Sequence, residues 1–324
     1  MDKNRNYIGV DIGGTTTAII VMNEEGYRID RIQYSTVTGE NSWPENFNRM
    51  KTAITGFIKK YKIESIGISC GGPLNSKTGF IIGPPNLPGW VNIPIVDEFR
   101  QAFSLPAFLE NDANAGALAE WKYGAGKGKE NIIFLTFGTG LGAGLILNGK
   151  LYSGTNDNGG EAGHIRLADD GPVGYHKRGS FEGYCSGTGL SQMMGFELLC
   201  LAEETGKEEM LKRYKEPGSV TGRDVVEWAK SGDALALKVV EKSGTYLGKG
   251  LSILVDILNP ELIIIGSMGV RLGDLLFEPA RRVMAEEALA GANSVCDIAA
   301  AELGESTGDY AALCVALKVN ELNK

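Results

Sequence analysis

A carboxylate between a strand and a helix is the first feature of this sequence that suggests chemistry. The segment Leu109-Glu110-Asn111-Asp112-Ala113-Asn114 ends an apolar run and begins an alanine-rich one. Asp112 is therefore expected at the carboxyl end of a strand, where α/β folds open their binding crevices. A carboxylate there could accept the proton of an attacking hydroxyl group. Capping of the following helix is the structural alternative, because aspartate is a favoured N-cap residue.

A glycine-rich turn near the N-terminus could bind an anion. In Asp11-Ile12-Gly13-Gly14-Thr15, the two glycines lack the Cβ atom that would keep an anion away from backbone N–H groups. Thr15, Thr16 and Thr17 add hydroxyl donors, and Asp11 could hold a hydrated Mg²⁺ ion against phosphate oxygens. The alternative is an ordinary glycine-rich hairpin.

Two further glycine segments extend this pattern. Glycines at positions 138, 140, 142 and 144 have a period of two, so one face of a predicted strand pair would carry no side chains. A bound phosphate or a neighbouring sheet could fill that face. Gly266-Ser267-Met268-Gly269 follows an apolar strand and could hold adenine or ribose, although such strand-to-helix turns are common. The segments match neither GxGxxG nor GxxxxGK[ST], which argues against dinucleotide and P-loop sites.

Two polar side chains stand three residues apart in Gly160-Glu161-Ala162-Gly163-His164. A carboxylate and a neutral imidazole on one turn can each hold a hydroxyl group of a ligand. A structural hydrogen-bonding role for His164 is the alternative. The spacing does not match HExxH, so a zinc peptidase is not indicated.

The elements that position these residues repeat along the chain. Strands are predicted at residues 7–10, 18–22 and 29–34, then a helix at 44–61, a strand at 66–69, a helix at 95–103 and a strand at 107–109. The second half begins alike, with strands at 132–137, 144–147 and 150–152, and later one at 262–265. We expect a small lobe of residues 1–118 plus 306–324, to which a helix at 308–317 returns, and a large lobe of residues 119–305.

Composition narrows the class of protein. Of 324 residues 43% are apolar and 22% charged, as in globular proteins, and the net charge of −8 gives no basic field for nucleic acid. The sequence has no uninterrupted apolar run of membrane-spanning length and no signal peptide, so a cytoplasmic protein without membrane or nucleic-acid partners is expected. Its five scattered cysteines favour reduced thiols.

Taken together, these motifs resemble the ROK family of bacterial sugar kinases and sugar-responsive repressors. The resemblance runs from about residue 7 to about residue 317. It implies an α/β, duplicated actin/hexokinase-like (ribonuclease H-like) fold with two lobes, a central cleft and usually a homodimer. The implied reaction is transfer of the γ-phosphate of MgATP to a hexose or N-acetylhexosamine hydroxyl, commonly the 6-OH. The motifs that carry the resemblance are Asp11-Ile-Gly-Gly-Thr15, Pro85-Asn-Leu-Pro-Gly-Trp90, Glu110-Asn-Asp-Ala-Asn-Ala115, Thr136-Phe-Gly-Thr-Gly-Leu-Gly-Ala-Gly144 and Gly160-Glu-Ala-Gly-His164.

The resemblance also implies a role for individual residues, with Asp112 as the catalytic base. Sugar contacts are expected from Gly72, Asn86, Asn111, Asp112, Glu161, His164 and Glu182. ATP and Mg²⁺ are expected at Asp11, Gly13, Gly14, Thr15, Thr16, Thr136, Gly138, Thr139, Gly140, Gly266 and Ser267.

Two departures from the family pattern change these expectations. In the family, three cysteines and the histidine of the GExGH motif hold a structural zinc, but the matching positions here are Val173, Tyr175 and Ser180. No zinc is therefore expected, and His164 is left as a sugar ligand and loop anchor. Many family kinases also carry lysine where Thr16 stands, so one cation near the phosphates is absent.

A sugar kinase is the function we expect, of the glucokinase or N-acetylhexosamine kinase kind. A non-catalytic, sugar-sensing transcriptional regulator is the alternative, although only six residues precede the first predicted strand and no helix-turn-helix is expected there. An acyl-phosphate kinase on the same fold is a third possibility. The aromatic and amide residues of segment 85–90 favour a sugar ring over an acyl phosphate.

Overall fold

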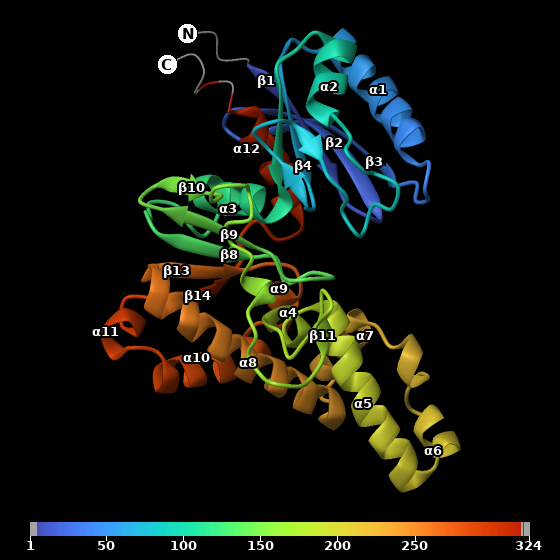
Figure 1. Ribbon diagram of the computed structural model, residues 1–324, viewed down its shortest axis with the longest axis vertical. Helices are drawn as coiled ribbons and strands as arrows, with labels where there is room; N and C mark the ends of the chain where they lie inside the picture. Colours follow the sequence, from blue (N-terminus) through green and yellow to red (C-terminus); the bar gives the residue numbers. More distant parts are fainter. Residues whose placement is uncertain (1–4, 319, 321–324) are drawn as a thin grey trace. The chain divides into compact units, whose positions relative to one another are not determined.

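A computed structural model describes residues 5–318 and 320 (Figure 1). The chain divides into two compact units. Unit 1 comprises Met1–Lys127, Leu151–Gly159 and Glu305–Lys324, and unit 2 comprises Gly128–Lys150 and Gly160–Gly304. Each unit is described here by itself.

Unit 1 is built around a five-stranded sheet in the order β3-β2-β1-β4-β7. Strands β1, β2 and β3 form an antiparallel meander, and β4 and β7 join it in parallel. The strands are β1 (Asn6–Ile12), β2 (Thr16–Asn23), β3 (Arg28–Ser35), β4 (Ile63–Cys70), β5 (Leu74–Asn75), β6 (Phe80–Ile81) and β7 (Ala107–Asn111). The helices are α1 (Trp43–Lys60), α2 (Ile95–Phe103), α3 (Asp112–Tyr123) and α12 (Thr307–Ala316).

Unit 2 repeats this topology in a sheet of order β10-β9-β8-β13-β14. As in unit 1, an antiparallel hairpin is extended by two parallel strands. The strands are β8 (Ile132–Leu135), β9 (Ala143–Leu147), β10 (Lys150–Tyr152, of which only Lys150 falls in the residue range of unit 2), β11 (Val173–Gly174), β12 (Lys177–Arg178), β13 (Leu262–Ile265) and β14 (Asp297–Ala300). The α-helices are α4 (Phe181–Tyr184), α5 (Gly187–Thr205), α6 (Lys207–Leu211), α7 (Gly222–Lys230), α8 (Ala234–Leu258), α9 (Met268–Leu272), α10 (Asp274–Glu287) and α11 (Ala290–Asn293). The 3-10 helices are η1 (Ala162–His164), η2 (Pro217–Ser219) and η3 (Gly304–Ser306).

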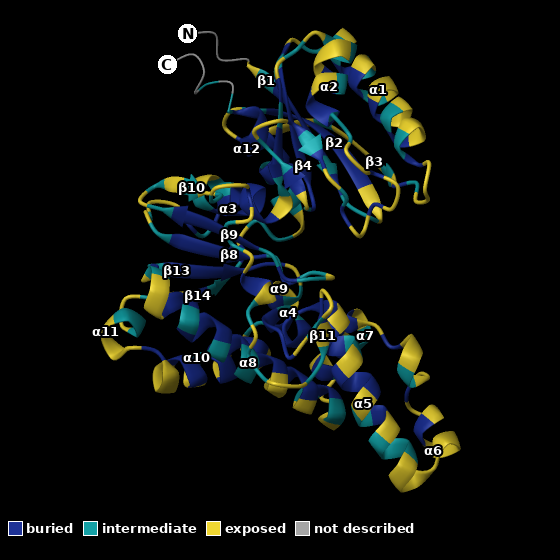
Figure 2. Ribbon diagram, viewed as in Figure 1, coloured by how far each residue is buried: buried dark blue, intermediate teal, exposed yellow. Residues whose placement is uncertain are grey.

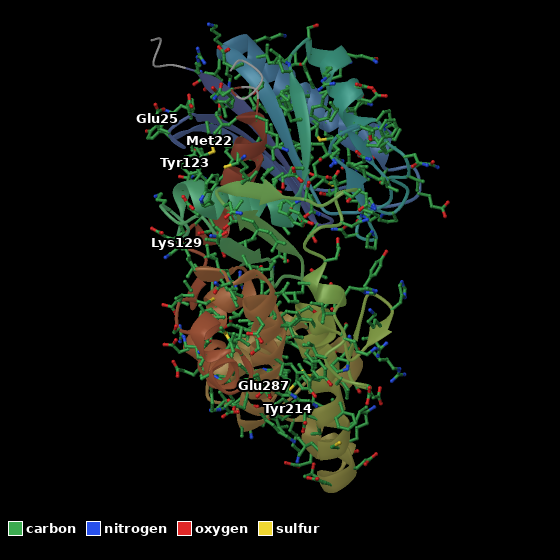
Figure 3. The ribbon with its side chains drawn as sticks, turned by 60° about the vertical axis from the view of Figure 1, so that its left-hand side comes forward. Met22, Glu25, Tyr123, Lys129, Tyr214 and Glu287 are labelled. Carbon is green, nitrogen blue, oxygen red and sulfur yellow. The ribbon has the colours of Figure 1, made fainter. Side chains whose placement is uncertain are left out.

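Alternation along β1 assigns its two faces to different helices. Ile8, Val10 and Ile12 belong to a core shared with α1 and α2, whereas Tyr7 belongs to a cluster with α12. Figure 2 shows β1, β2 and β4 almost continuously buried, because helices cover both faces of this part of the sheet. Figure 3 shows Met22 and Tyr123 close together at the edge of the α12 cluster.

Close packing of α12 on the sheet depends on glycine. A Cβ atom at Gly67 would lie 2.1 Å from the backbone nitrogen of Ala316, and one at Gly9 would lie 2.8 Å from the Ala312 Cβ. Real Cβ atoms do not approach so closely, so the helix can rest on β1 and β4 only at these side-chain-free positions. The predicted return of a helix at 308–317 to the first half of the chain is confirmed.

The order of elements predicted for the first half is confirmed, with the short β5–β6 hairpin as an addition. The period-two interpretation of the second glycine segment is wrong. Residues 136–142 form a turn between β8 and β9, and only Gly144 lies in a strand. Within the described residues, no helix has the length and apolar character needed to cross a bilayer.

Candidate active site

Hydrogen bonds close the first glycine-rich turn, which joins β1 to β2. The N–H group of Gly13 donates to the Thr16 carbonyl at 2.9 Å. Thr36, which follows β3, donates its N–H to the Thr15 carbonyl at 2.9 Å and its Oγ1 hydroxyl to the Gly13 carbonyl at 2.7 Å. Thr15 and Thr16 are exposed, so a bound phosphate could reach their hydroxyl groups.

The first turn lies against the segment that contains Asn86. A Cβ atom at Gly14 would be 2.6 Å from the Asn86 carbonyl oxygen, so the two backbones meet only because position 14 is glycine. A Cβ atom at Gly71 would in turn be 3.5 Å from Asn86 Nδ2 and 3.8 Å from Asp112 Oδ2. Unit 1 therefore brings the first glycine-rich turn, the predicted sugar ligand Asn86 and the predicted base together.

Asn111, not Asp112, caps helix α3. Its Oδ1 accepts hydrogen bonds from the N–H groups of Ala113 and Asn114, at 3.0 and 3.4 Å. The capping alternative for Asp112 is therefore wrong, because Asp112 is the first residue inside the helix. Asn111 Nδ2 faces Gly72, where a Cβ atom would lie 3.3 Å away.

The side chain of Asp112 is accessible, and its pKa is raised. It is exposed, and partial desolvation raises its pKa above the ordinary aspartate value. The N–H group of Ala113 donates to Oδ1 at 2.8 Å and partly offsets this shift. A raised pKa makes a carboxylate a stronger proton acceptor, provided that it remains ionised at the working pH.

Asp11 lies among other charges of unit 1. Burial, and after it the carboxylates of Asp112 and Asp309, raise its pKa to about 7, although Arg31 acts to lower it. Helix α12 begins against this carboxylate, since a Cβ atom at Gly308 would lie 2.3 Å from Asp11 Oδ2. Asp309 itself is buried and accepts a hydrogen bond from Arg31 Nε at 3.0 Å.

Trp90 contradicts the expectation that the aromatic residue of segment 85–90 meets a sugar ring. Its side chain is fully buried, and Nε1 donates to Ser42 Oγ at 3.1 Å. Its ring packs edge-on against Trp43, with 4.8 Å between the centroids. The tryptophan therefore anchors this segment to the start of α1.

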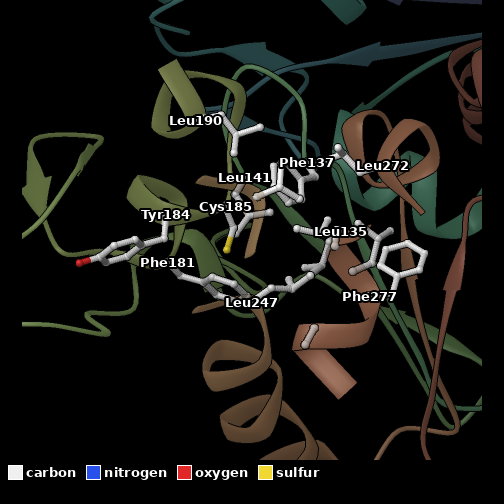
Figure 4. Close-up of a cluster of buried hydrophobic side chains, with 14 of the residues drawn as sticks. Leu135, Phe137, Leu141, Phe181, Tyr184, Cys185, Leu190, Leu247, Leu272 and Phe277 are labelled. Atoms are coloured by element: carbon white, nitrogen blue, oxygen red, sulfur yellow. The ribbon is translucent and has the colours of Figure 1, made fainter. Parts of the chain in front are cut away.

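The second glycine-rich turn in unit 2 is tied to the hydrophobic core on both sides. Phe137 and Leu141 are buried in one cluster with Phe181 and Cys185, as Figure 4 shows. Between them the backbone folds back on itself, because the N–H of Gly138 donates to the Gly140 carbonyl at 3.0 Å.

Thr136 closes the base of this second turn. Its N–H donates to the Gly142 carbonyl at 3.0 Å, and its Oγ1 accepts the Gly142 N–H at 2.9 Å. The exposed face of the turn thus consists mainly of backbone.

The Glu182 side chain hydrogen-bonds the backbone of the same turn. Its Oε2 accepts the N–H of Leu141 at 2.9 Å, and a Cβ atom at Gly140 would lie only 2.6 Å from that oxygen. A side chain at position 140 would therefore displace the Glu182 carboxylate from its place at the turn. Sequence reasoning gave Glu182 a sugar contact and missed this link to the second glycine-rich turn.

The Glu161–His164 turn packs on the same structure. Ala162 and Gly163 are buried, whereas Glu161 and His164 are exposed. A Cβ atom at Gly163 would be 2.2 Å from the Leu141 carbonyl oxygen. Unit 2 therefore brings Glu161, His164 and Glu182 together beside Leu141.

The third glycine segment joins the second turn. Ser267 has a positive φ of 51° and Phe137 one of 32°, and the N–H group of Met268 donates to the Phe137 carbonyl at 3.2 Å. Non-glycine residues in this region carry backbone strain, which is often retained where a ligand must be approached closely. A Cβ atom at Gly138 would meet Ser267 Oγ at 3.8 Å, so residues 136–142 and 266–269 form one surface of unit 2.

Comparison with known proteins assigns the chain to a family. The model of the ROK family matches residues 7–319. The chain belongs to the ROK family. It is 32% identical over 313 residues to a glucokinase of Halalkalibacterium halodurans, covering 94% of this chain and 93% of that protein. It is also 32% identical over 293 residues to an N-acetylmannosamine kinase of Yersinia pestis, covering 88% and 89%.

A ROK glucokinase from Streptomyces griseus, crystallised in complex with glucose and AMPPNP, has a similar structure. The TM-score is 0.80 at 30% sequence identity, over 97% of this chain and 99% of that chain. The predictions of the ROK family and of an actin/hexokinase-like fold are confirmed.

The residues at the zinc positions expected from the ROK resemblance do not fit a metal. Val173 and Tyr175 offer no thiolate, and the Ser180 hydroxyl caps α4 by accepting the N–H of Gly183 at 3.1 Å. Cys185 is buried and directs its thiol to the Ser243 carbonyl at 3.5 Å. Among the described residues, no group of three or more His, Cys, Asp or Glu side chains could hold a metal ion.

Other residues of this ROK site left no signal in the sequence. Thr36 hydrogen-bonds the first turn and Asp309 acts on the charge of Asp11, yet they lie 23 and 298 positions from Gly13 and Asp11, respectively, in no recognisable motif. Contacts between such distant positions come from the strand order and the return of α12.

Proposed function

We propose that this protein transfers the γ-phosphate of ATP to the 6-OH of a hexose or N-acetylhexosamine, with Asp112 as general base. The chain is an ATP-dependent sugar kinase. Its glucokinase and N-acetylmannosamine kinase relatives match nearly its whole length, and a structural neighbour binds glucose together with an ATP analogue.

One observation carries the assignment of the base. An accessible carboxylate with a raised pKa lies next to Gly71, and Gly71 and the first phosphate turn both contact Asn86. A proton acceptor, a polar ligand for the acceptor sugar and a phosphate turn are thus neighbours within unit 1. Phosphoryl transfer needs these three groups and little covalent chemistry from the protein.

In this reaction Asp112 would take the proton of the sugar hydroxyl as the oxygen attacks phosphorus. The Ala113 N–H at Oδ1 fixes the carboxylate and leaves Oδ2, near Gly71, for the proton. Asn111 uses Oδ1 for capping, so its Nδ2 group remains to donate to a sugar oxygen. Asn86, with Glu161, His164 and Glu182 of unit 2, is proposed to bind the other hydroxyl groups.

The phosphates are proposed to bind to the two glycine-rich turns. Backbone N–H groups and the hydroxyls of Thr15 and Thr16 would donate to them in unit 1, and the 136–142 turn would do so in unit 2. Ser267 and Gly266 are assigned to the adenosine portion of the nucleotide.

Asp11 is proposed to hold a hydrated magnesium ion through its single carboxylate. The carboxylates of Asp112 and Asp309 both raise the pKa of Asp11, and Arg31 is the cation that lowers it. A hydrated Mg²⁺ ion held by Asp11 would supply the missing positive charge and offset charge on the transferred phosphate.

The experiment is an ADP-release assay with MgATP and a sugar panel of glucose, N-acetylmannosamine, N-acetylglucosamine and fructose. We expect at least one sugar to be phosphorylated, and ³¹P NMR of the product to place the phosphate on the 6-position. Sugar binding without ADP release would instead indicate a sugar-sensing regulator. A homodimer, proposed from the family resemblance, is tested by light scattering on the same sample.

A further inference from the structure

A short hairpin separates His164 from Glu182, and one glutamine of α5 holds it. Gln192 Oε1 accepts the N–H of Val173 at 2.8 Å, and its Nε2 donates to the Val173 carbonyl at 2.8 Å. Both polar atoms of the amide are thus used on one backbone position, as a neighbouring strand would use them. This fixes β11 against helix α5.

Strand β11, which Gln192 fixes, lies directly against Glu182. Glu182 is the residue that hydrogen-bonds the second glycine-rich turn. A Cβ atom at Gly174 would be 2.8 Å from the Glu182 Cβ and 2.6 Å from the Gly183 nitrogen. Glu182 then reaches Leu141 through its hydrogen bond of 2.9 Å. A contiguous chain of contacts therefore leads from Gln192 through the hairpin and Glu182 to the second glycine-rich turn.

The other strand of the hairpin holds the histidine. Lys177 Nζ donates to the His164 carbonyl at 2.8 Å. Tyr175, at the tip, packs its ring edge-on against the His164 imidazole, with 6.3 Å between the centroids. Movement of the hairpin would therefore displace His164 as well as Glu182.

We propose that Gln192 is a positioning residue for sugar binding, acting through the β11–β12 hairpin on Glu182 and His164. Three positions of this hairpin region, Val173, Tyr175 and Ser180, are those at which the family resemblance implies metal ligands, and they do not fit a metal. In place of a metal ion, hydrogen bonds between side chains and the backbone fix this region. The inference rests on the proposed assignment of Glu182 and His164 to the sugar.

Hydrogen exchange measured on the protein tests this series of contacts, from Gln192 to the second glycine-rich turn. The measurement does not depend on catalysis. The variant Gln192→Ala removes both bonds to Val173, and exchange at residues 173–183 and at the Leu141 amide should become about fivefold to thirtyfold faster. Gln101→Ala, at an exposed glutamine of α2, is the matched control and should leave these amides unchanged. Unchanged exchange at Leu141 in Gln192→Ala would overturn the inference, whatever the activity of the enzyme.

Kinetics of the same proteins test the consequence for the sugar. In Gln192→Ala, the KM for the phosphorylated sugar should rise about fivefold or more, while kcat at saturating sugar stays within about twofold of wild type. A lower kcat with unchanged KM would mean a merely structural role and would also overturn the inference. Lys177→Met, which releases only the His164 carbonyl, should show a smaller rise in KM, and it supplies the comparison if Gln192→Ala folds poorly. Failure of wild type to phosphorylate any sugar would instead refute the proposed function.

Discussion

Replacement of Asp11 by asparagine is expected to stabilise the ligand-free protein while it impairs catalysis. Burial and two neighbouring carboxylates raise the Asp11 pKa from 3.8 to about 7. The folded state therefore binds a proton more tightly than the unfolded state does, and wild type loses stability as the pH rises from about 4 to about 7. Asparagine is neutral throughout this range and does not incur that loss.

The size of the effect follows from the shift. A pKa of about 7 in place of 3.8, at about 1.36 kcal/mol for each tenfold change in proton affinity, gives an upper bound of about 4 kcal/mol. Because the Asp11 side chain is partly accessible, solvent screening reduces this upper bound, and a gain of about 1–3 kcal/mol at pH 8 is expected.

Urea unfolding without Mg²⁺ or ATP, at pH 8 and at pH 4, measures the difference in unfolding free energy between wild type and Asp11→Asn. The difference should be largest at pH 8 and nearly vanish at pH 4. Asp170→Asn is the control of opposite sign, because the Gly171 N–H and Arg178 lower the pKa of that carboxyl and no gain at pH 8 is expected. A destabilised Asp11→Asn at pH 8, or a difference independent of pH, would refute the reasoning.

Two further predictions concern single contacts, and a third concerns the metal content of the protein. Gly140→Ala places a Cβ 2.6 Å from Glu182 Oε2 and should lower kcat/KM for ATP at least tenfold, whereas Gly291→Ala, which meets open space, should have no effect in the same assay. Trp90→Phe loses the bond to Ser42 and should cost about 1–2 kcal/mol of unfolding free energy in urea; an unchanged midpoint would contradict the anchoring role. Elemental analysis of the purified protein should find zinc far below one atom per chain, and a stoichiometric amount would disprove the metal-free account of the hairpin.

The fold was largely predictable from local patterns. The apolar runs of β1, β2 and β4 are fully buried strands, and their short turns leave few ways to connect them. The duplicated strand order follows because both halves begin with a hairpin whose turn is rich in glycine. Helix α12 was predictable as a helix. Its packing against Gly9 and Gly67 was not, because it depends on a close approach of two backbones that the spacing of apolar residues does not reveal.

The residues of the candidate site could be predicted from the sequence. The contacts that these residues make with one another could not. Asp112 and Asn111 were found by sequence, yet which of them caps α3 depends on backbone angles at the end of β7. Glycines 138, 140 and 142 were predicted in a strand because alternation there has the strand period, whereas the buried anchors Phe137 and Leu141 force a turn. Trp90 was expected at a ligand because aromatic rings suit sugars, but a nearby hydroxyl and a hydrophobic core hold it inside.

The central claim is tested most directly by Asp112→Asn, a change that removes the proton acceptor and keeps the shape of the side chain. With MgATP and the sugar that wild type phosphorylates, kcat should fall about 10²-fold to 10⁴-fold, while calorimetry finds sugar affinity within a fewfold of wild type. Turnover within tenfold of wild type, with correct folding shown by circular dichroism, would contradict the assignment of Asp112 as the base.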